Sequence, residues 1–289
     1  MSFPAQLAAD AAAVQSRLDV ALSGFSDQPV IHAMRYAVQG GKRLRGFLVL
    51  ESARMLGVAQ ERAISAAAAV EALHAYSLVH DDMPCMDNDA LRRGLPTVHV
   101  KWDEATAVLA GDALQTLAFE LLTDPALGTG ETRIALVAGL ARASGAEGMV
   151  LGQALDIAAE TADRPLDLQE ITALQAGKTG ALIRFSAEAG AILAGADPAP
   201  LRAYAGALGL AFQIWDDVLD VTGDAALTGK AVGKDAAAGK ATFVSLLGLD
   251  GARARATSLI AEAEAALVPY GPAARNLIDC ARFVIARQS

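Results

Sequence analysis

Helix-length runs of alanine and leucine, separated by glycine and proline, are the feature that most restricts how this sequence can fold. In the segment 62–80, for example, Ile64, Ala68, Ala72 and Ala75 recur at steps of three and four residues, the spacing of one helix face. We find no sustained alternation of apolar and polar residues of the kind that marks a strand. Aromatic residues, which favour strands, make up only 5% of the chain. We therefore expect an all-α fold of about ten or more helices.

Length and charge limit the domain organisation and the class of partner. The chain has 289 residues, which is enough for one large domain or two small ones. Because no repeat, linker or shift in composition marks a boundary, we expect a single all-α domain over residues 1–289. Lysine and arginine number 24 against 33 aspartates and glutamates, a formal charge of −9, so nucleic-acid binding is not expected.

The longest stretch without a charged residue is too short for a membrane-spanning helix, so we expect a chain that does not span a membrane. It covers residues 203–215, 13 residues, whereas a spanning helix needs roughly 20. We expect this stretch to lie in the centre of the fold. The two cysteines, Cys85 and Cys280, cannot form a disulfide framework, which favours a reducing, cytoplasmic compartment.

Two clusters of aspartates directly follow apolar helical segments. Because like charges repel on one helix face, carboxylates packed in this way need a cation. In the second cluster, Asp216 and Asp220 differ by about 40° around an ideal helix and share a face. Carboxylate oxygens suit Mg²⁺, which usually shares its protein carboxylates with substrate phosphates. The carboxylates of the two clusters are Asp81, Asp82 and Asp87, then Asp216, Asp217 and Asp220.

The first cluster is expected to bend the chain. Asp81 and Asp87 are six residues apart, about 120° out of phase on a straight helix. Pro84 lacks an N–H and clashes with the preceding turn, so the helix should end or kink near residues 82–84. That bend would bring Asp87 back toward Asp81. His74, seven residues before Asp81, shares its helix face within about 20°.

Basic residues accompany both clusters, a mixture that fits polyanionic substrates held partly through Mg²⁺ and partly by direct ion pairs. In GGKRLR, residues 40–45, Lys42 and Arg45 face the same way beside a helix start that favours an anion. Arg43 and Lys234 are instead expected to be solvated surface charges. A Walker-type loop is absent, so Lys178 does not mark a P-loop. The bases of this set are Lys42, Arg45, Arg92, Arg93, Lys178, Lys230 and Lys240.

At these residues the sequence resembles the trans-prenyl diphosphate synthases, most closely the bacterial farnesyl diphosphate synthases. Two aspartate motifs in order, with their flanks, carry the resemblance. Gly46 stands where the family usually has proline, and Gln175 and Ala176 replace a common histidine ahead of Lys178. The matching segments are GGKRLR (40–45), EALHAYSLVHDDMPCMDNDALRRGLPTVH (71–99), DEATAVLAGDALQTLAFELL (103–122), GMVLGQALD (148–156), KTGALI (178–183), FQIWDDVLD (212–220) and the lysine-rich run 230–243.

The resemblance implies an all-α prenyltransferase fold with helices around a deep cavity, and a homodimer. It implies that isopentenyl diphosphate is condensed head to tail with dimethylallyl and then geranyl diphosphate, giving farnesyl diphosphate. Geranylgeranyl diphosphate synthase is the alternative activity, and a non-catalytic partner subunit ranks below it because both motifs are intact. A terpene cyclase usually pairs one aspartate motif with an Asn/Ser/Glu motif, which is not the pattern here.

The resemblance also assigns roles. It implies magnesium, three ions with bound diphosphate, and a catalytic set of Lys178, Thr179 and Gln213. Asp81, Asp87 and Asp216 would be the primary ligands, with Asp82, Asp217 and Asp220 bound directly or through water. Lys42, Arg45, His74 and Arg93 would hold isopentenyl diphosphate without metal. Arg92, Lys178, Lys230 and Lys240 would hold the allylic diphosphate, with Thr179 and Gln213 presenting oxygens toward the cation.

Product length depends, in this family, on the residues four and five before the first aspartate, here Ser77 and Tyr76. By resemblance, the bulk of Tyr76 favours a C15 product. Helix geometry supports this only partly: Tyr76 lies about 140° around the helix from Asp81, whereas Ser77 is nearly in line. A residue on a neighbouring helix therefore stays an alternative floor for the cavity.

Overall fold

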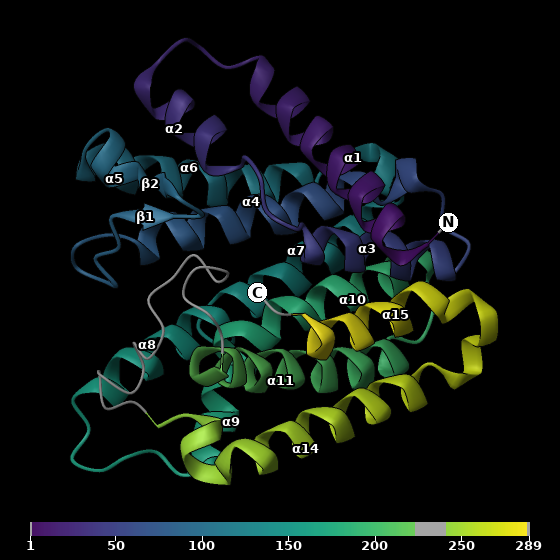
Figure 1. Cartoon of the computed structure of the whole chain (residues 1–289). Helices are drawn as coiled ribbons and strands as arrows, with labels where there is room; N and C mark the ends of the chain where they lie inside the picture. The colour runs from purple at the N-terminus through teal and green to yellow at the C-terminus, as the bar shows by residue number, and fades with distance from the viewer. Residues whose placement is uncertain (1, 223–240, 288–289) are drawn as a thin grey trace. The chain divides into compact units, whose positions relative to one another are not determined.

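The computed structural model describes residues 2–222 and 241–287, and it is built almost entirely of helices (Figure 1). This confirms the all-α prediction. The chain divides into two compact units, residues 1–137 with 192–195 and residues 138–191 with 196–289. The boundaries fall within α7 (Gly130–Ser144) and α10 (Ala181–Ala194). The expected single domain stays a prediction.

The first unit is organised around α4 (Ile64–Asp81) and α6 (Glu104–Leu121), which pack against each other. α4 is buried nearly all round at its N-terminal half, where the run from Ala66 to Val70 is wholly inaccessible, because alanines let neighbouring helices approach closely. α6 begins at Asp103, whose carboxylate accepts a hydrogen bond from Thr106 N at 2.7 Å. The remaining elements of this unit are α1 (Phe3–Ser23), α2 (Pro29–Ala37), α3 (Leu44–Met55), η1 (Gln60–Arg62), α5 (Val98–Lys101) and η2 (Pro125–Leu127).

A small hairpin interrupts the helices of the first unit. Strands β1 (Leu91–Arg92) and β2 (Leu95–Pro96) pair antiparallel. The turn residues Arg93 and Gly94 both have positive φ, 55° and 75°, as a tight two-residue hairpin requires. This hairpin is not predicted from the sequence, because the strands are too short to show alternation and the turn is not Asn-Gly or Asp-Gly.

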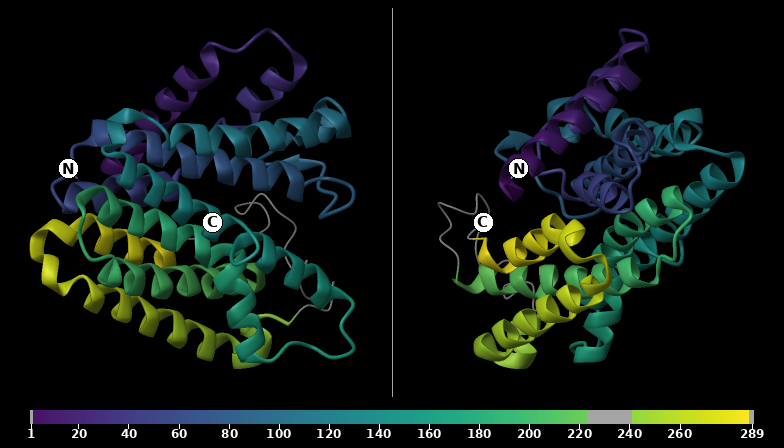
Figure 2. Two further views of the ribbon diagram at one scale, coloured as in Figure 1. Left: turned by 180° about the vertical axis from the view of Figure 1, so that it is seen from behind. Right: turned by 90° about the vertical axis from the view of Figure 1, so that its right-hand side faces the viewer.

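The second unit is organised around α11 (Ala199–Thr222), which packs against α14 (Phe243–Ala266) and α15 (Arg275–Ala286) (Figure 2). Most of the apolar stretch 203–215 is buried, as expected, and the buried Tyr204 donates a hydrogen bond to Leu277 O at 2.7 Å. The other elements here are α8 (Met149–Glu160), α9 (Leu168–Gln175), η3 (Ala176–Gly180) and η4 (Val268–Ala274).

One helical stretch among the described residues, Gly130–Glu160, is long and apolar enough to cross a membrane by length and composition. A third of its most apolar window, 33%, is buried. A single stretch of this kind is weak evidence for a span, because core helices of soluble proteins meet the same criteria. The expectation of a chain without a membrane span therefore stays a prediction.

Candidate active site

The first aspartate cluster lies where α4 ends. The helix stops at Asp81, and the chain turns back so that Asp87 N donates a hydrogen bond to Asp81 O at 2.9 Å. The turn also places Asn88 in the left-handed region, with φ 52°. The predicted end of the helix near residues 82–84, and the return of Asp87 to Asp81, are both confirmed. Asp81 is half-buried and Asp87 is exposed.

Asp82, the middle aspartate of this cluster, is buried and bound by an arginine. Nε of Arg92 lies 2.8 Å from both carboxylate oxygens of Asp82, a charge-assisted contact of high geometric specificity. Arg92 stands on strand β1, so the small hairpin is what brings this guanidinium to the end of α4. Although burial disfavours its charged form, the hydrogen bond to Asp82 raises the pKa of Arg92. Asp82, a predicted metal ligand, thus forms an ion pair with Arg92, which is predicted to bind diphosphate.

A group of basic residues, Arg45, His74 and Arg93, lies beside this cluster in the same unit. Gly41 has φ +85°, and a Cβ built there would lie only 2.7 Å from Nη2 of Arg93. The left-handed backbone therefore favours glycine here, and the end of the Arg93 side chain lies over it. Arg93 itself has φ +55°, a conformation that non-glycine residues rarely adopt and that concentrates at functional sites. The hairpin and the GGKRLR segment together bring Arg93 to the glycine pair.

Two members of this basic group have properties typical of an anion-binding site. Nε of Arg45 is a buried nitrogen that has no hydrogen-bond partner among the described residues. Burial, followed by the guanidinium groups of four arginines led by Arg45 and Arg93, holds the pKa of His74 well below its ordinary range. A neutral imidazole beside cationic groups can donate an N–H to an anion without adding to their mutual repulsion. The residues Arg45, His74 and Arg93, predicted to act together, are therefore brought together.

The expectation for Arg43 was wrong. The residue is 7% exposed, and its guanidinium donates to Val38 O and pairs with Glu71 at 3.4 Å. It is buried because its acceptors, Val38 O and Glu71, lie inside the unit, and its backbone is left-handed, φ 52°, just before α3 begins. Lys234, the other residue expected to be a solvated charge, lies outside the described residues.

Gly46 departs from the family pattern for a visible reason. Its N–H donates a hydrogen bond to Oε1 of the buried Glu71 at 2.8 Å, which a proline could not do. A Cβ at Gly46 would meet Val14 at 3.1 Å and Glu71 at 3.2 Å. Glycine at position 46 therefore provides both an N–H and enough space for the Glu71 carboxylate, which also pairs with Arg43.

In the second unit, Lys178 and Thr179 lie in η3, a π-helical turn between α9 and α10. Turns of this type occur often at functional sites. Nζ of Lys178 forms an ion pair with Asp156 Oδ2 of α8 at 2.8 Å. α8 approaches so closely that a Cβ at Gly152 would lie 2.0 Å from Lys178 N. Gly152, which lies in the matching segment 148–156, is thus required for the position of Lys178.

Gln213 is oriented by a residue that also departs from the family pattern. Its Nε2 donates to Oε1 of Gln175, the last residue of α9, at 2.8 Å. Gln175 stands at one of the two positions, ahead of Lys178, where a histidine is common. The structure therefore places Gln213 next to η3, which carries Lys178 and Thr179.

The second aspartate cluster lies on the C-terminal part of α11. Asp217 accepts a hydrogen bond from Phe243 N, at the start of α14, at 2.6 Å. Asp216, Asp217 and Asp220 are all half-buried. Lys230 and Lys240, predicted to act with this cluster, lie outside the described residues.

Arg287 is a residue of this site that the sequence analysis missed. Its Nη2 donates to Asp216 Oδ1 at 2.7 Å and to Phe212 O at 3.2 Å. Its guanidinium also lies over the Phe212 ring, 3.9 Å from the centroid. Trp215 Nε1 donates to the backbone oxygen of Arg287 at 3.2 Å. A cation from the end of α15 therefore contacts the aspartate that is predicted to be a primary metal ligand.

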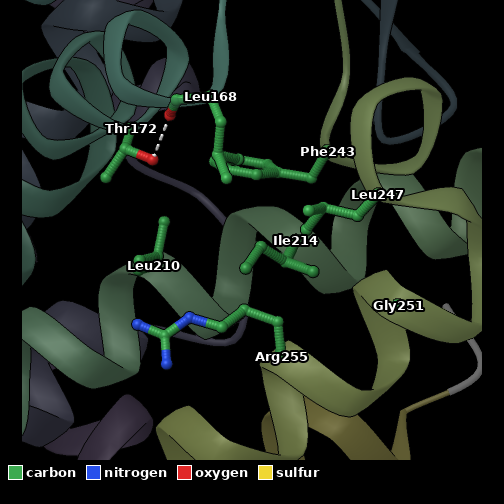
Figure 3. Close-up of a pocket in the computed structure, with 8 residues that line it drawn as sticks. All are labelled: Leu168, Thr172, Leu210, Ile214, Phe243, Leu247, Gly251 and Arg255. Carbon is green, nitrogen blue, oxygen red and sulfur yellow. Dashed lines mark hydrogen bonds between the residues drawn. The ribbon is translucent and has the colours of Figure 1, made fainter.

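A cavity of about 240 Å³ lies elsewhere in the second unit, between α9, α11 and α14 (Figure 3). Leu210 and Ile214 of α11 line it with Phe243 of α14, and the Arg255 side chain lies at its edge. Ile214 and Asp216 point about 160° apart around α11. This cavity is thus on the other side of the helix from Asp216 and is not the predicted substrate cavity.

The donor sets fit magnesium in the form that phosphate-binding enzymes use. Within the part of the chain that the structure describes, no three His, Cys, Asp or Glu side chains form a ready-made metal cage. Mg²⁺ is usually held by one or two carboxylates together with substrate phosphates and water, so a complete protein cage is not required. In the first unit Asp81 with the adjacent Asp87, and in the second unit Asp216 on α11, each offer hard oxygen ligands of the kind that Mg²⁺ takes.

Residues 27–266 match the family described as polyprenyl synthetase. The chain is 49% identical over 277 residues to the farnesyl diphosphate synthase of Escherichia coli, covering 92% of each protein. It is 41% identical over 287 residues to geranylgeranyl pyrophosphate synthase 9 of Arabidopsis thaliana, covering 96% of this chain and 80% of that protein. It is also similar to the crystal structure of an FPP/GFPP synthase from Zymomonas mobilis, with a TM-score of 0.89, 45% identity and 98% coverage of both chains.

Proposed function

Because the chain belongs to the polyprenyl synthetase family, we propose that it condenses isopentenyl diphosphate with dimethylallyl and geranyl diphosphate to give farnesyl diphosphate. The order of charged and neutral side chains along α4 supports the proposal most directly. The helix ends in the carboxylates Asp81 and Asp87, and two turns earlier it carries a neutral His74 among arginines. One helix thus presents a metal-type site and a metal-free anion site, as a reaction between two diphosphates requires.

Different residues are proposed to bind the two substrates. Arg45, His74 and Arg93, with Lys42, hold isopentenyl diphosphate directly. The buried Nε of Arg45, which has no hydrogen-bond partner within residues 2–222 and 241–287, supports this role, because a bound diphosphate would supply an acceptor. Asp81, Asp87 and Asp216 would hold magnesium, with Asp217 and Asp220 as further ligands, and Asp82 would act by fixing Arg92. When bound, magnesium neutralises the charge that develops on the departing pyrophosphate.

The reaction breaks the bond between C1 of the allylic substrate and its diphosphate oxygen, leaving an allylic cation. The double bond of isopentenyl diphosphate attacks C1, and the new tertiary cation then loses a proton to pyrophosphate. Arg92 and Lys178, with Lys230 and Lys240, would stabilise the leaving anion. Gln213 donates its amide N–H to Gln175, so its oxygen is the end left to face the cation, together with the Thr179 hydroxyl.

The family match from residue 27 to 266 runs through both compact units, which supports one catalytic domain over the whole chain. We also propose a cytoplasmic homodimer. No disulfide joins Cys85 and Cys280, which suits a reducing compartment. α8 exposes an apolar face that includes Val150 (49% exposed), Leu151 (46%) and Leu155 (44%), which a second copy would cover. Sedimentation of a monomer at all concentrations would contradict the dimer.

Product analysis tests the proposed reaction. The purified chain is incubated with Mg²⁺, labelled isopentenyl diphosphate and either dimethylallyl or geranyl diphosphate, and the dephosphorylated products are separated by length. We expect C15 as the main product from both primers. A C20 main product would show that the chain makes geranylgeranyl rather than farnesyl diphosphate. No incorporation of label would indicate a non-catalytic subunit.

A further inference from the structure

Glu71 is a buried carboxylate of α4, 4% exposed, to which the proposed reaction gives no role. Its Oε1 accepts a hydrogen bond from Gly46 N at 2.8 Å, and its Oε2 lies 3.4 Å from Nη1 of Arg43. Glutamate is almost never fully buried unless it is paired. The two donors are three residues apart at the start of α3, so one carboxylate fixes both ends of the short segment 43–46.

Arg45 lies inside this fixed segment, directly before Gly46. Its Nε is a buried nitrogen that has no hydrogen-bond partner in the described ranges 2–222 and 241–287. A buried donor without a partner of its own depends on its backbone for its position. Burial lowers the pKa of Arg45, and the negative charge of Glu71 opposes this shift. Glu71 therefore acts on Arg45 through the backbone and also through its charge.

Glu71 and His74 are three residues apart on α4 and are therefore neighbours on the helix surface. Burial, followed by the charges of Arg45 and Arg93, lowers the pKa of His74, which places these groups close to one another. The helix α4 thus contributes His74 to the basic group directly. Through Glu71, one turn earlier, the same helix also contacts the segment that contains Arg45.

We propose that Glu71 is a positioning residue of the isopentenyl diphosphate site: its carboxylate fixes residues 43–46 and so holds Arg45 where Nε donates to the diphosphate. The inference rests on the proposed function, which assigns Arg45 to isopentenyl diphosphate. A carboxylate is needed because it offers an acceptor to each of the two donors. A glutamine that accepted the Gly46 N–H would present its NH₂ group to Arg43, so that a donor would face a donor.

Position and charge predict opposite effects on the binding of isopentenyl diphosphate. If Glu71 supplied only negative charge, its removal would leave the basic group more positive, and an anion would bind more tightly. If Glu71 positions Arg45, its removal lets residues 43–46 shift, and the anion loses a hydrogen bond and binds more weakly. The direction of the change in the dissociation constant therefore distinguishes the two roles.

Replacing Glu71 by glutamine keeps the shape of the side chain and removes its charge. We expect Glu71→Gln to raise the dissociation constant of isopentenyl diphosphate about tenfold, the factor that corresponds to one hydrogen bond to a charged group. Titration calorimetry in the presence of a chelator measures this constant. Binding of a non-ionisable thio analogue of geranyl diphosphate with Mg²⁺ should be unchanged, whereas a general folding defect would weaken the binding of both ligands.

Replacing Glu71 by aspartate keeps the negative charge and shortens the side chain by one methylene group. Arg43 then retains a counter-charge, so this variant avoids the unpaired buried charge that glutamine leaves. The shortened carboxylate does not reach Gly46 and Arg43 together, so we expect Glu71→Asp to weaken the binding of isopentenyl diphosphate to a similar extent. Normal binding of isopentenyl diphosphate by Glu71→Asp would contradict the positioning role.

Glu51→Gln is the matched control. Glu51 is also a buried carboxylate of the first unit, but it lies beyond residues 43–46 on α3 and pairs with Arg54, so isopentenyl diphosphate should bind normally to this variant. Unchanged or tighter binding of isopentenyl diphosphate by Glu71→Gln would overturn the inference and leave the proposed function intact. An unsubstituted chain that neither binds isopentenyl diphosphate nor forms a prenyl product would instead overturn the proposed function.

Discussion

Replacing Gly152 by alanine should lower kcat by about 100-fold, the loss that a catalytic group misplaced by roughly 1 Å can cause. The added Cβ would lie 2.0 Å from Lys178 N and 2.6 Å from the Gly177 carbonyl carbon. Both are backbone atoms of the π-helical turn, which cannot rotate away as a flexible side chain would. The turn must shift, and Lys178 with Thr179 must shift with it. Steady-state kinetics with geranyl and isopentenyl diphosphate measures the effect.

Gly206→Ala is the control for this change. Gly206 lies inside α11 of the same unit, and nothing stands within 4 Å of a Cβ built there. Alanine favours a helix over glycine by up to about 1 kcal/mol, so this variant should be as active as the original chain and slightly more stable. If Gly152→Ala retained full activity, the close approach of α8 would have no bearing on the position of Lys178.

Replacing Asp81 by asparagine should have a still larger effect, lowering kcat on the order of 10²–10³-fold, as the loss of one preorganised charge-stabilising group does. Asparagine keeps the shape of the side chain and leaves the backbone bond from Asp87 N to Asp81 O intact. The substitution removes the negative charge of the carboxylate, which would bind a magnesium ion together with the allylic diphosphate.

Calorimetry separates this loss from a folding defect. Mg²⁺ is titrated in the presence of a bisphosphonate, and Asp81→Asn should bind it much more weakly while its thermal unfolding stays close to that of the unchanged chain. Asp19→Asn, on the exposed face of α1, is the matched control and should bind magnesium normally. Normal magnesium binding by Asp81→Asn would remove Asp81 from the set of metal ligands.

Local sequence rules predicted the features that depend on neighbouring residues. The helix spacing of apolar residues predicted the all-α fold, and Pro84 predicted the end of α4 and the return of Asp87. Both follow from backbone geometry within a few residues. The association of Arg45, His74 and Arg93 was predicted by resemblance, and the structure adds the reason: a tight hairpin carries Arg93 to Gly41.

Features that depend on partners distant in sequence were missed. Arg43 looked like a surface charge because its acceptor, Glu71, is 28 residues away. Arg287 belongs to no local motif, and only the packing of α15 against α11 brings it to Asp216. The π-helical turn at Lys178 has no periodicity that separates it from an α-helix over five residues. The importance of Gly152 is visible only when the opposite turn, η3, is in place.

The central claim is that the chain has one diphosphate site that needs metal and one that does not. Titration calorimetry tests it directly, with isopentenyl diphosphate and a non-ionisable thio analogue of geranyl diphosphate, each measured with Mg²⁺ and with a chelator. We predict that isopentenyl diphosphate binds under both conditions, whereas the allylic analogue binds only with Mg²⁺. Equal binding of the allylic analogue with and without Mg²⁺, or binding of isopentenyl diphosphate only with Mg²⁺, would contradict the account.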